Sequence, residues 1–237
     1  MADRHHLLAA FARQFDQHPA RLVPYWRARW ARLVRTRVAE TLKRGLDVLA
    51  AGTGLVLLSP LLALIALAIK LTDRGPVLFW QTRVGRHGRE FAFPKFRSMV
   101  VNADQLKTSL LAQNDHGDSV TFKMRRDPRV TGVGRILRRL SLDEMPQLWS
   151  VLVGDMSLVG PRPAVPREVA RYGVADRRRL EVTPGLTCIW QVSGRGEVPF
   201  DQQVRMDVDY ILTRNLKRDL ILLLKTIPAV LTGRGAY

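Results

Sequence analysis

The sequence predicts an α+β protein, mainly helical, with one cytoplasmic domain, a re-entrant membrane helix hairpin and interfacial amphipathic helices. Three observations carry this prediction. Residues 48–69 form a run of 22 residues without a charged side chain. Lys and Arg are frequent on both sides of that run. After residue 70, short apolar runs typical of strands alternate with longer segments whose pattern is compatible with helices.

Composition narrows the possible classes of protein. The 237 residues include 38 Lys and Arg against 21 Asp and Glu, a net charge of +17, and 46% are hydrophobic. This apolar fraction excludes an unfolded chain, and the length suits one domain with appendages. Cys188 is the single cysteine, which excludes a disulfide framework and a Cys-based zinc site, and none of the five His has metal-ligand spacing. The surplus charge indicates a polyanionic partner, with nucleic acid, anionic lipid and phosphorylated substrates all open.

The N-terminal segment, residues 1–46, holds ten basic and three acidic residues. Between residues 25 and 43, apolar side chains recur at steps of three and four with arginines between them: Trp26, Trp30, Leu33, Val34, Val38 and Leu42. This pattern predicts a basic amphipathic helix whose Trp residues suit the interface of an anionic leaflet. The same stripe is also compatible with a helix that packs on the domain.

The uncharged run is long enough to cross a bilayer. As a helix its 22 residues would measure about 33 Å, against a hydrocarbon core of about 30 Å. Both flanks are basic, and Lys and Arg favour the cytoplasmic side, so both ends are expected on that side. Ser59-Pro60 supplies the break that a re-entrant helix needs, because Pro60 leaves the carbonyl of Val56 without its amide donor and the Ser59 hydroxyl can bond to a freed carbonyl. A kinked helix that spans the membrane remains the alternative.

Beyond the run, the sequence predicts a series of short elements. Strands at 77–80 and 90–93 are joined by a glycine-containing stretch, 83–89, in a hairpin. Helices are predicted at 99–113, 133–140, 141–153, within 162–180 and at 201–215, with a polar loop at 114–118 and an irregular, proline-rich piece at 161–166. The last apolar piece, 220–231, is too short to span a membrane and is expected to lie on its surface.

The densest group of chemically active side chains lies between residues 123 and 163, where the adjacent carboxylates Asp143 and Glu144 are surrounded by arginines. Ser141, three residues before Glu144, matches a capping box and predicts that a helix begins there. Acidic residues in a first turn favour the helix dipole without any further role, so a purely structural interpretation stays open. In the functional interpretation, the carboxylates hold Mg²⁺ or attack phosphorus, and arginines bind phosphate oxygens. Further basic residues would extend the anion site: Lys95, Arg97 and Arg195.

Four long motifs and the apolar run follow one another in an order found in one known family. They are KRGLDV at 43–48, the run with Ser59-Pro60, GPVLFWQTRVGRHGREFAFPKFRSM at 75–99, DPRVTGVGRILRRLSLDEMPQLWSVLVGDMSLVGPRP at 127–163 and TPGLTCIWQVSGR at 183–195. From Lys43 to its C-terminus the chain thus resembles the bacterial sugar transferases, the monotopic phosphoglycosyl transferases. The resemblance implies an enzyme on the cytoplasmic face of the bacterial inner membrane. Such an enzyme transfers a sugar 1-phosphate from a UDP-sugar to undecaprenyl phosphate, releases UMP and starts a polysaccharide or glycan, with anionic inner-membrane lipids and downstream glycosyltransferases as further partners.

Carried over residue by residue, the resemblance assigns roles to single positions. Asp143 matches the nucleophile that forms a covalent phosphosugar intermediate, and Glu144 matches its Mg²⁺-binding neighbour, with Asp143 a second candidate ligand. Arg162, in the PRP motif, matches the residue associated with the nucleotide-sugar phosphate and uridine. The remaining matches lie in supporting motifs: Lys95 and Arg97 in KFRSM and Arg129 in DPR as anion-binding or structural residues, and Ser59 and Pro60 as the helix break.

We therefore expect three segments: a basic amphipathic segment at 1–46, a re-entrant helix at 47–70, and a cytoplasmic catalytic domain at 71–237 that ends in an interfacial helix. Longer relatives in this family place spanning helices and an extra domain before the core, so the chain resembles the minimal catalytic form. Cys188 stands where relatives usually carry Gly, and we expect it to be tolerated because it adjoins no inferred catalytic group. The C-terminal TGRGAY resembles the glucose- and galactose-phosphate subgroup.

One alternative of a different class is a membrane-tethered basic protein that binds nucleic acid or anionic lipid without catalysis. The net charge and the amphipathic helix suit such a protein. The sequence contains no recognisable nucleic-acid-binding module, however, so we expect no nucleic-acid partner.

Overall fold

The computed structural model describes residues 19–103, 105, 106 and 127–233, and the chain divides into two units, residues 1–44 and 45–237. The first unit is helical from Pro19 onwards, as the start of α2 (Pro19–Asp73). The amphipathic segment predicted at 25–43 therefore has a helical backbone, and its side chains before residue 37 lie outside the described part.

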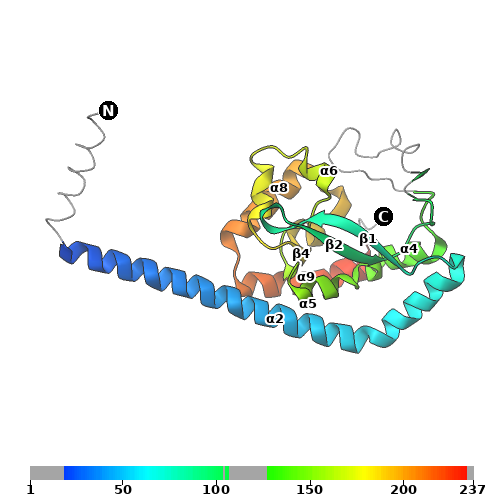
Figure 1. Ribbon diagram of the computed structural model, residues 1–237, viewed down its shortest axis with the longest axis horizontal. Coiled ribbons are helices and arrows are strands. Elements are labelled where there is room, and N and C mark those ends of the chain that lie inside the picture. Colours follow the sequence, from blue (N-terminus) through cyan, green and yellow to red (C-terminus); the bar gives the residue numbers. More distant parts are fainter. Residues whose placement is uncertain (1–18, 104, 107–126, 234–237) are drawn as a thin grey trace. The chain divides into compact units, whose positions relative to one another are not determined.

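Within the second unit, α2 carries the uncharged run as one continuous helix, which bends in its cyan part (Figure 1). Pro60 is the single proline between residues 45 and 73, and the Ser59 hydroxyl donates to the carbonyl of Val56 at 2.8 Å. The expected bond from Ser59 to a carbonyl freed by the proline is thus confirmed. The helix bends instead of breaking, because the hydroxyl replaces the one missing amide donor.

One face of this part of α2 packs on the rest of the second unit. Ala51 lies in a core cluster with side chains of β2 (Glu90–Phe96), α5 (Gln147–Val153) and the segment that follows α5: Phe91, Phe93, Leu148, Val151 and Met156. Ile65 and Ile69 form a second cluster with Phe96 and Leu137. The Asp47 carboxylate accepts the amide of Leu158 at 3.2 Å, which fixes the start of this packed face.

The opposite face of α2 is exposed and apolar, with exposed side chains at Leu49, Val56, Leu57, Leu64, Leu67 and Leu71. The stretch Arg37–Thr72 is long and apolar enough to cross a membrane, and 11% of its most apolar window is buried. A helix with one packed and one uncovered apolar face differs from the buried core helix of a soluble protein, which is covered all round. This pattern indicates association with a membrane.

The predicted hairpin is confirmed, with longer strands than expected. Strand β1 (Leu78–Val84) pairs antiparallel with β2, in a register that places Leu78 opposite Phe96 and Val84 opposite Glu90. The turn between them, η1 (Arg86–Gly88), contains two residues with positive φ, His87 and Gly88. Inward side chains of β2 enter the core, so the hairpin lies directly over α2 and α5.

Helix α4 (Gly132–Arg139) matches the helix predicted at 133–140 and begins at Thr131, whose hydroxyl accepts the amide of Gly134. The single helix predicted at 141–153 is wrong. Ser141 has a left-handed backbone with φ of 54° and caps nothing, and the chain forms a 3₁₀ turn, η3 (Leu142–Glu144), before α5 begins. Pro146 explains the division, since it has no amide to donate to Leu142 and the helical ladder must restart there.

A second pair of strands, β3 (Ser157–Val159) and β4 (Gly185–Thr187), runs parallel and was not predicted, because three residues are too few for a visible alternation. Two glycines allow the close approach that continues this pair. A Cβ atom at Gly185 would lie 2.0 Å from the amide nitrogen of Gly160. The chain after β3, which includes Arg162, is thereby held against the residues around β4, with the amide of Gly185 donating to the carbonyl of Pro161 at 2.9 Å.

The remaining elements complete the unit. The helix predicted within 162–180 appears as two short pieces, α6 (Pro166–Val169) and η4 (Asp176–Glu181), followed by α7 (Ile189–Ser193) and η5 (Arg195–Glu197). Helix α8 (Phe200–Thr213) matches the one predicted at 201–215, and α9 (Leu216–Thr232) contains the last apolar piece. The helix predicted at 99–113 is wrong at its start, because Met99 forms a β-bridge with Val130 and residues 101 and 102 form a turn. Residues 103, 105 and 106 are helical, and residues 104 and 107–113 lie outside the described residues, as does the loop at 114–118.

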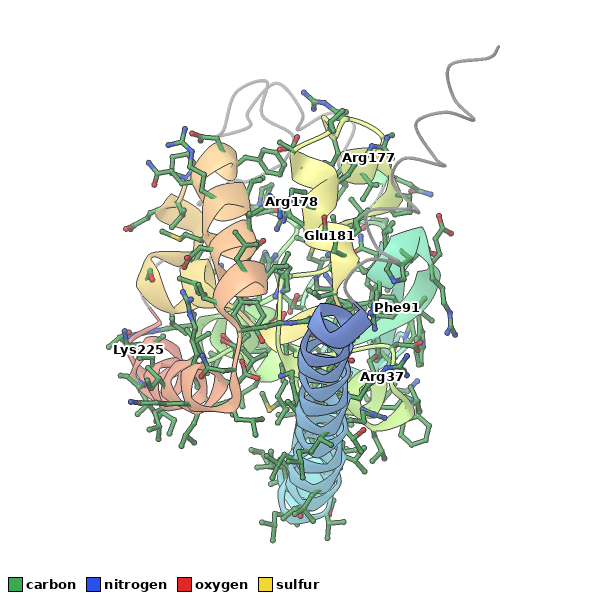
Figure 2. The ribbon with its side chains drawn as sticks, turned by 90° about the vertical axis from the view of Figure 1, so that its left-hand side faces the viewer. Arg37, Phe91, Arg177, Arg178, Glu181 and Lys225 are labelled. Carbon is green, nitrogen blue, oxygen red and sulfur yellow. The ribbon has the colours of Figure 1, made fainter. Side chains whose placement is uncertain are left out.

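Helix α9 resembles α2 in having one buried and one exposed apolar face. Leu222 packs with Val159 and Tyr210 in a third core cluster. The exposed side chains include Leu220, Leu224, Ile227 and Leu231, and α5 adds Trp149 and Val153. Both views place α9 and the cyan part of α2 along the same side of the second unit (Figures 1 and 2), and Figure 2 shows Arg177 and Arg178 of η4 on the opposite side.

The close approach at Gly185 gives a test of this fold. We expect Gly185→Ala to destabilise the protein by about 2 to 3 kcal/mol, because the new methyl group meets backbone that cannot move aside. Gly132→Ala is the matched control, since nothing lies within 4 Å of its Cβ position. Thermal unfolding in detergent measures both variants, and equal midpoints would contradict the described pairing of β3 and β4.

Candidate active site

A cavity of about 430 Å³ brings together side chains from distant parts of the second unit. Strands β1 and β2 contribute Arg83 and Lys95, η3 contributes Asp143 and Glu144, and the segment after β3 contributes Arg162. Arg195 of η5 also lines it. The predicted carboxylate pair and most of the predicted anion-binding residues thus share one cavity.

The carboxylate pair owes its position to the turn that the sequence did not reveal. The left-handed backbone of Ser141 redirects the chain at the end of α4, and Asp143 then lies buried, with 8% of its surface exposed. Burial, together with the negative charge of Glu144, raises the pKa of Asp143 to about 6, although Arg138 and Lys95 oppose the shift. Asp143 is therefore a carboxylate whose charge is poorly compensated by the protein.

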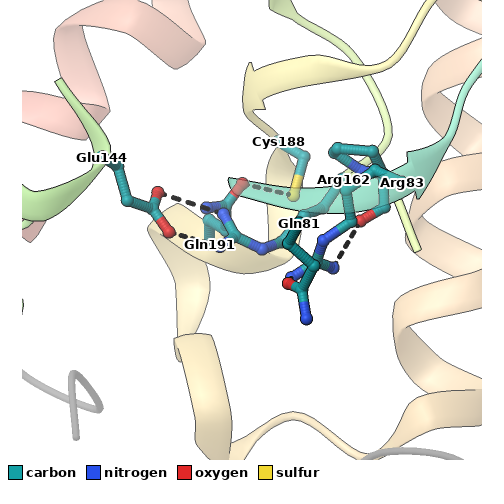
Figure 3. Close-up of polar contacts among 7 residues, drawn as sticks. Gln81, Arg83, Glu144, Arg162, Cys188 and Gln191 are labelled. Carbon is teal, nitrogen blue, oxygen red and sulfur yellow. Dashed lines mark hydrogen bonds and ion pairs between the residues drawn. The ribbon is translucent and has the colours of Figure 1, made fainter. Parts of the chain in front are cut away.

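Glu144 is in a different electrostatic state, because Arg162 donates hydrogen bonds to both of its carboxylate oxygens (Figure 3). Arg162 Nη1 donates to Oε2 at 3.1 Å, and Nη2 donates to Oε1. Burial alone would raise the pKa of Glu144, but the charge and hydrogen bonds of Arg162 outweigh it and lower that pKa. For Arg162, the interaction with Glu144 outweighs burial in the same way and raises its pKa. Glu144 is thus held ionised beside the less compensated Asp143.

Two further cations are partly desolvated in the cavity. Burial lowers the pKa of Lys95 to about 8, helped by the charge of Arg83 and opposed by that of Asp143. Burial and the charge of Arg162 lower the pKa of Arg83 to about 10. A cation whose pKa is lowered by like charges and burial gains from a nearby anion. The cavity is therefore suited to a ligand with several negative oxygens, such as a diphosphate.

Other predicted site residues lie outside this cavity. Arg97 is buried against the turn before β1, where a Cβ atom at Gly75 would lie 1.9 Å from its Nη1 atom. Arg129 pairs with Asp127, with Nε–Oδ1 and Nη2–Oδ2 distances of 2.8 and 2.6 Å. The contacts of Arg97 and Arg129 are therefore with residues that support the fold, outside the cavity. Ser59 and Pro60 lie at the bend-forming position of α2.

The structure adds cavity residues that sequence reasoning missed. They include Arg83, which lies in the basic flank of the apolar run, and Arg138, which is one of the arginines between residues 123 and 163. Aromatic side chains form another wall, with the rings of Tyr172 and Phe200 5.6 Å apart. The guanidinium of Arg179 lies over both rings, and its Nε atom lies 2.7 Å from Oδ2 of the buried Asp207. The only available signal was that Arg83 lies in the QTRVG stretch of a quoted motif.

Cys188 lies closer to the cavity than expected. Its Sγ atom donates to Oε1 of Gln191 at 3.1 Å, and Gln191 lines the cavity near Arg162 (Figure 3). Burial raises the pKa of Cys188 well above its ordinary value, so the thiol stays neutral. The expectation was that Cys188 adjoins no inferred catalytic group, and its hydrogen bond is to Gln191 of the cavity wall and not to Asp143 or Glu144.

The donor set is compatible with Mg²⁺. Among the residues that the structure describes, no group of three or more His, Cys, Asp or Glu side chains could hold a metal by itself. Mg²⁺ is commonly bound by one or two carboxylates and completed by substrate phosphates and water. Asp143 and Glu144 supply two carboxylates, and each Glu144 oxygen keeps a lone pair besides the one facing Arg162. A metal that also binds phosphate fits these residues.

Comparison with known proteins supplies the context for this cavity. The family model for bacterial sugar transferases matches residues 38–233. The exopolysaccharide production protein ExoY of Rhizobium meliloti is 43% identical over 198 residues, covering 82% of this chain and 88% of that protein. The undecaprenyl-phosphate galactose phosphotransferase of Salmonella typhimurium is 44% identical over 205 residues, covering 85% of this chain but 43% of that longer protein.

A third relative is the UDP-glucose:undecaprenyl-phosphate glucose-1-phosphate transferase of Caulobacter vibrioides, 44% identical over 218 residues that cover 85% of this chain and 74% of that protein. All the motifs that formed the resemblance fall within residues 38–233, and so do the carboxylates and cations of the cavity. Because the match takes in most of the chain and the relatives exceed 40% identity, the chain belongs to the bacterial sugar transferase family and is a transferase.

Proposed function

We propose that this protein transfers a sugar 1-phosphate from a UDP-sugar to undecaprenyl phosphate, through a covalent intermediate on Asp143. The observation that carries the proposal is the buried, poorly compensated carboxylate of Asp143 in a cavity ringed by Arg83, Lys95 and Arg162. The names of the relatives support the two substrates, since they include transferases that act between UDP-glucose or galactose and undecaprenyl phosphate.

In the first step, an oxygen of the Asp143 carboxylate attacks the phosphorus that carries the sugar. The bond between that phosphorus and the oxygen bridging to the uridine-bearing phosphate breaks, and its electron pair leaves with UMP. The product is an acyl phosphate that joins Asp143 to the sugar phosphate. A carboxylate that burial has made less stable as an anion has more to gain from this bond.

In the second step, a phosphate oxygen of undecaprenyl phosphate attacks the same phosphorus. The bond to Asp143 breaks, and the carboxylate recovers its electron pair and its charge. The product is an undecaprenyl-diphosphate sugar. Two displacements at one phosphorus allow both substrates to use the same cations in turn, which explains why one cavity suffices.

The other residues of the cavity position and neutralise the phosphates. Arg162 and Lys95 offer donors to non-bridging oxygens, and the ionised Glu144 orients Arg162. Glu144, with Asp143, would hold Mg²⁺, which supplies charge neutralisation at the transferring phosphate when bound. The aromatic wall of Tyr172 and Phe200 offers ring faces to the uridine.

We also propose that the protein lies on the cytoplasmic face of the bacterial inner membrane, with α2 entering and leaving on one side. The basic flanks of the apolar run and the bend in the cyan part of α2 support this arrangement over a spanning helix. Helix α9 lines the cavity with Leu223 and Val230 and exposes its other apolar face. A lipid acceptor in the leaflet would therefore reach the cavity beside α9.

The surrounding partners follow from this placement. The basic surface would attract anionic inner-membrane lipids, and the lipid-linked sugar would pass to downstream glycosyltransferases that begin an exopolysaccharide. Family membership favours this catalytic role over a non-catalytic protein that binds nucleic acid.

The reaction is tested by UMP release with UDP-glucose and UDP-galactose, each with undecaprenyl phosphate and Mg²⁺. We expect Asp143→Asn to lower kcat by about 10³-fold or more, because the amide is a poor nucleophile. EDTA should stop the wild-type reaction. Asp155→Asn, on the loop after α5, is the matched control and should keep wild-type kcat. Full turnover by Asp143→Asn would contradict the assignment.

The burial of Asp143 has a consequence for stability. A folded-state pKa of about 6, against an ordinary aspartate pKa of 3.8, means that the ionised carboxylate destabilises the folded protein at neutral pH, by on the order of 2 to 3 kcal/mol. In EDTA at pH 7.5, Asp143→Asn should therefore unfold at higher temperature than the wild type. The gain should shrink as the pH falls below about 6 and vanish only well below 3.8, where Asp143 is neutral in both states. A destabilised Asn variant at pH 7.5 would contradict this electrostatic description.

The topology is tested with cysteines introduced singly at Glu40 and Thr72 in a Cys188→Ala background. With both flanks cytoplasmic, a membrane-impermeant maleimide should label neither position in intact spheroplasts and both after disruption. A periplasmic cysteine in another protein of the same cells provides the positive control. Labelling of one position from outside would show a spanning helix.

A further inference from the structure

Strand β1 is tied at two successive residues to the segment that follows Arg162. The amide of Val84 donates to the carbonyl of Ala164 at 2.8 Å, and the two residues form an isolated antiparallel bridge. One residue earlier, Nη1 of Arg83 donates to the carbonyl of Pro163, also at 2.8 Å. The second of these bonds joins a cavity side chain to the residue directly after Arg162.

Arg83 is itself held firmly. Its Nη2 atom donates to Oε1 of Gln81 at 2.7 Å, and its guanidinium lies over the ring of Phe93, 4.9 Å from the centroid. Gln81 and Arg83 are two residues apart on β1, so their side chains share one face of the strand. Figure 3 shows Gln81 and Arg83 next to Arg162 and the residues that Arg162 contacts.

Charge alone does not account for an arginine at this place. Burial and the like charge of Arg162 lower the pKa of Arg83, and the charges of Glu168 and Glu144 oppose this only in part. Placing two arginines side by side in a partly desolvated cavity costs free energy, and directional hydrogen bonds to Pro163 and Gln81 offset part of that cost. The geometry of Arg83 is therefore the property that distinguishes it from any other cation.

We propose that Arg83 is a positioning residue for the transfer reaction, which fixes the carbonyl of Pro163 and thereby the direction in which Arg162 meets Glu144 and the substrate phosphates. The proposal rests on the proposed function, because it concerns how Arg162 acts in that reaction. Arg83 works with Gln81 as a pair, and the rigid hairpin carries both.

This role makes a distinctive prediction for the conservative variant. Arg83→Lys keeps the positive charge, but a lysine ammonium cannot bond to Pro163 and Gln81 in the planar fork that the guanidinium uses. If position matters, the lysine variant should fail to restore activity. If Arg83 only supplies charge, the lysine variant should be close to wild type.

The experiment measures steady-state UMP release by full-length protein with UDP-glucose or UDP-galactose, whichever the wild type uses, plus undecaprenyl phosphate and Mg²⁺. We expect Arg83→Lys to lower kcat by roughly 10- to 100-fold, with a smaller change in the KM for the UDP-sugar. The reason is that Arg162 keeps its charge but is no longer held in the orientation that the reaction needs. Arg86→Gln removes an exposed arginine from the same hairpin turn and should leave kcat unchanged.

Gln81→Met provides a second variant that leaves Arg83 in place. It should lower kcat by a smaller factor, and adding it to Arg83→Lys should cause little further loss, since both act through one support. Thermal midpoints of all variants show whether the protein is folded at the assay temperature.

Wild-type kcat in Arg83→Lys, additive losses in the double variant, or an equal loss in Arg86→Gln would each overturn the role of Arg83. The role of Arg83 would also be overturned if, in both Arg83→Lys and Gln81→Met, the fraction of activity lost equals the fraction of protein that is unfolded at the assay temperature. Failure of the proposed function is seen separately, as absence of UMP release by the wild-type protein.

Discussion

Two carboxylates that follow each other in the chain occupy one cavity, and the pairing of Glu144 with Arg162 makes them different. Arg162 satisfies both oxygens of Glu144 and keeps it ionised, whereas Asp143 is buried with less compensation. In a medium of low dielectric constant the two charges repel, and without Arg162 both would be costly. Because of this difference, Asp143 is suited to react with the substrate, whereas Glu144 is suited to orient Arg162.

Most of the second unit can be understood as support for that pairing. Ser141 and Pro146 produce the short turn that presents the two carboxylates. The close approach of Gly160 and Gly185 fixes the segment that carries Arg162, and β1 holds the same segment from the other side. Helix α9 and the part of α2 after residue 45 pack on this assembly with one face and leave another apolar face uncovered, so the cavity and the proposed membrane surface belong to the same unit.

The sequence revealed those features that rest on local pattern. The hairpin of β1 and β2, helices α4 and α8, and the carboxylate pair beside Arg162 and Lys95 all follow from alternation, helical spacing or motif. The features it concealed depend on contacts distant in the chain. Strands β3 and β4 are too short to show a pattern, and the parallel pair exists only because two glycines allow contact. Ser141 matched a capping box, but Pro146 prevented the helix that the box would begin. Arg83 fell in the stretch predicted to join the two strands of the hairpin, and its bond to Pro163 and its place in the cavity depend on a segment 80 residues away.

The account depends most on a covalent bond between Asp143 and the sugar phosphate. Intact-protein mass spectrometry after incubation with Mg²⁺ and the preferred UDP-sugar, in the absence of undecaprenyl phosphate, tests it directly. We expect a mass increase of one hexose phosphate, mapped to the peptide with Asp143 and lost on addition of the acceptor. A wild-type protein that turns over both substrates but never carries the sugar phosphate, or carries it on another residue, would contradict the account.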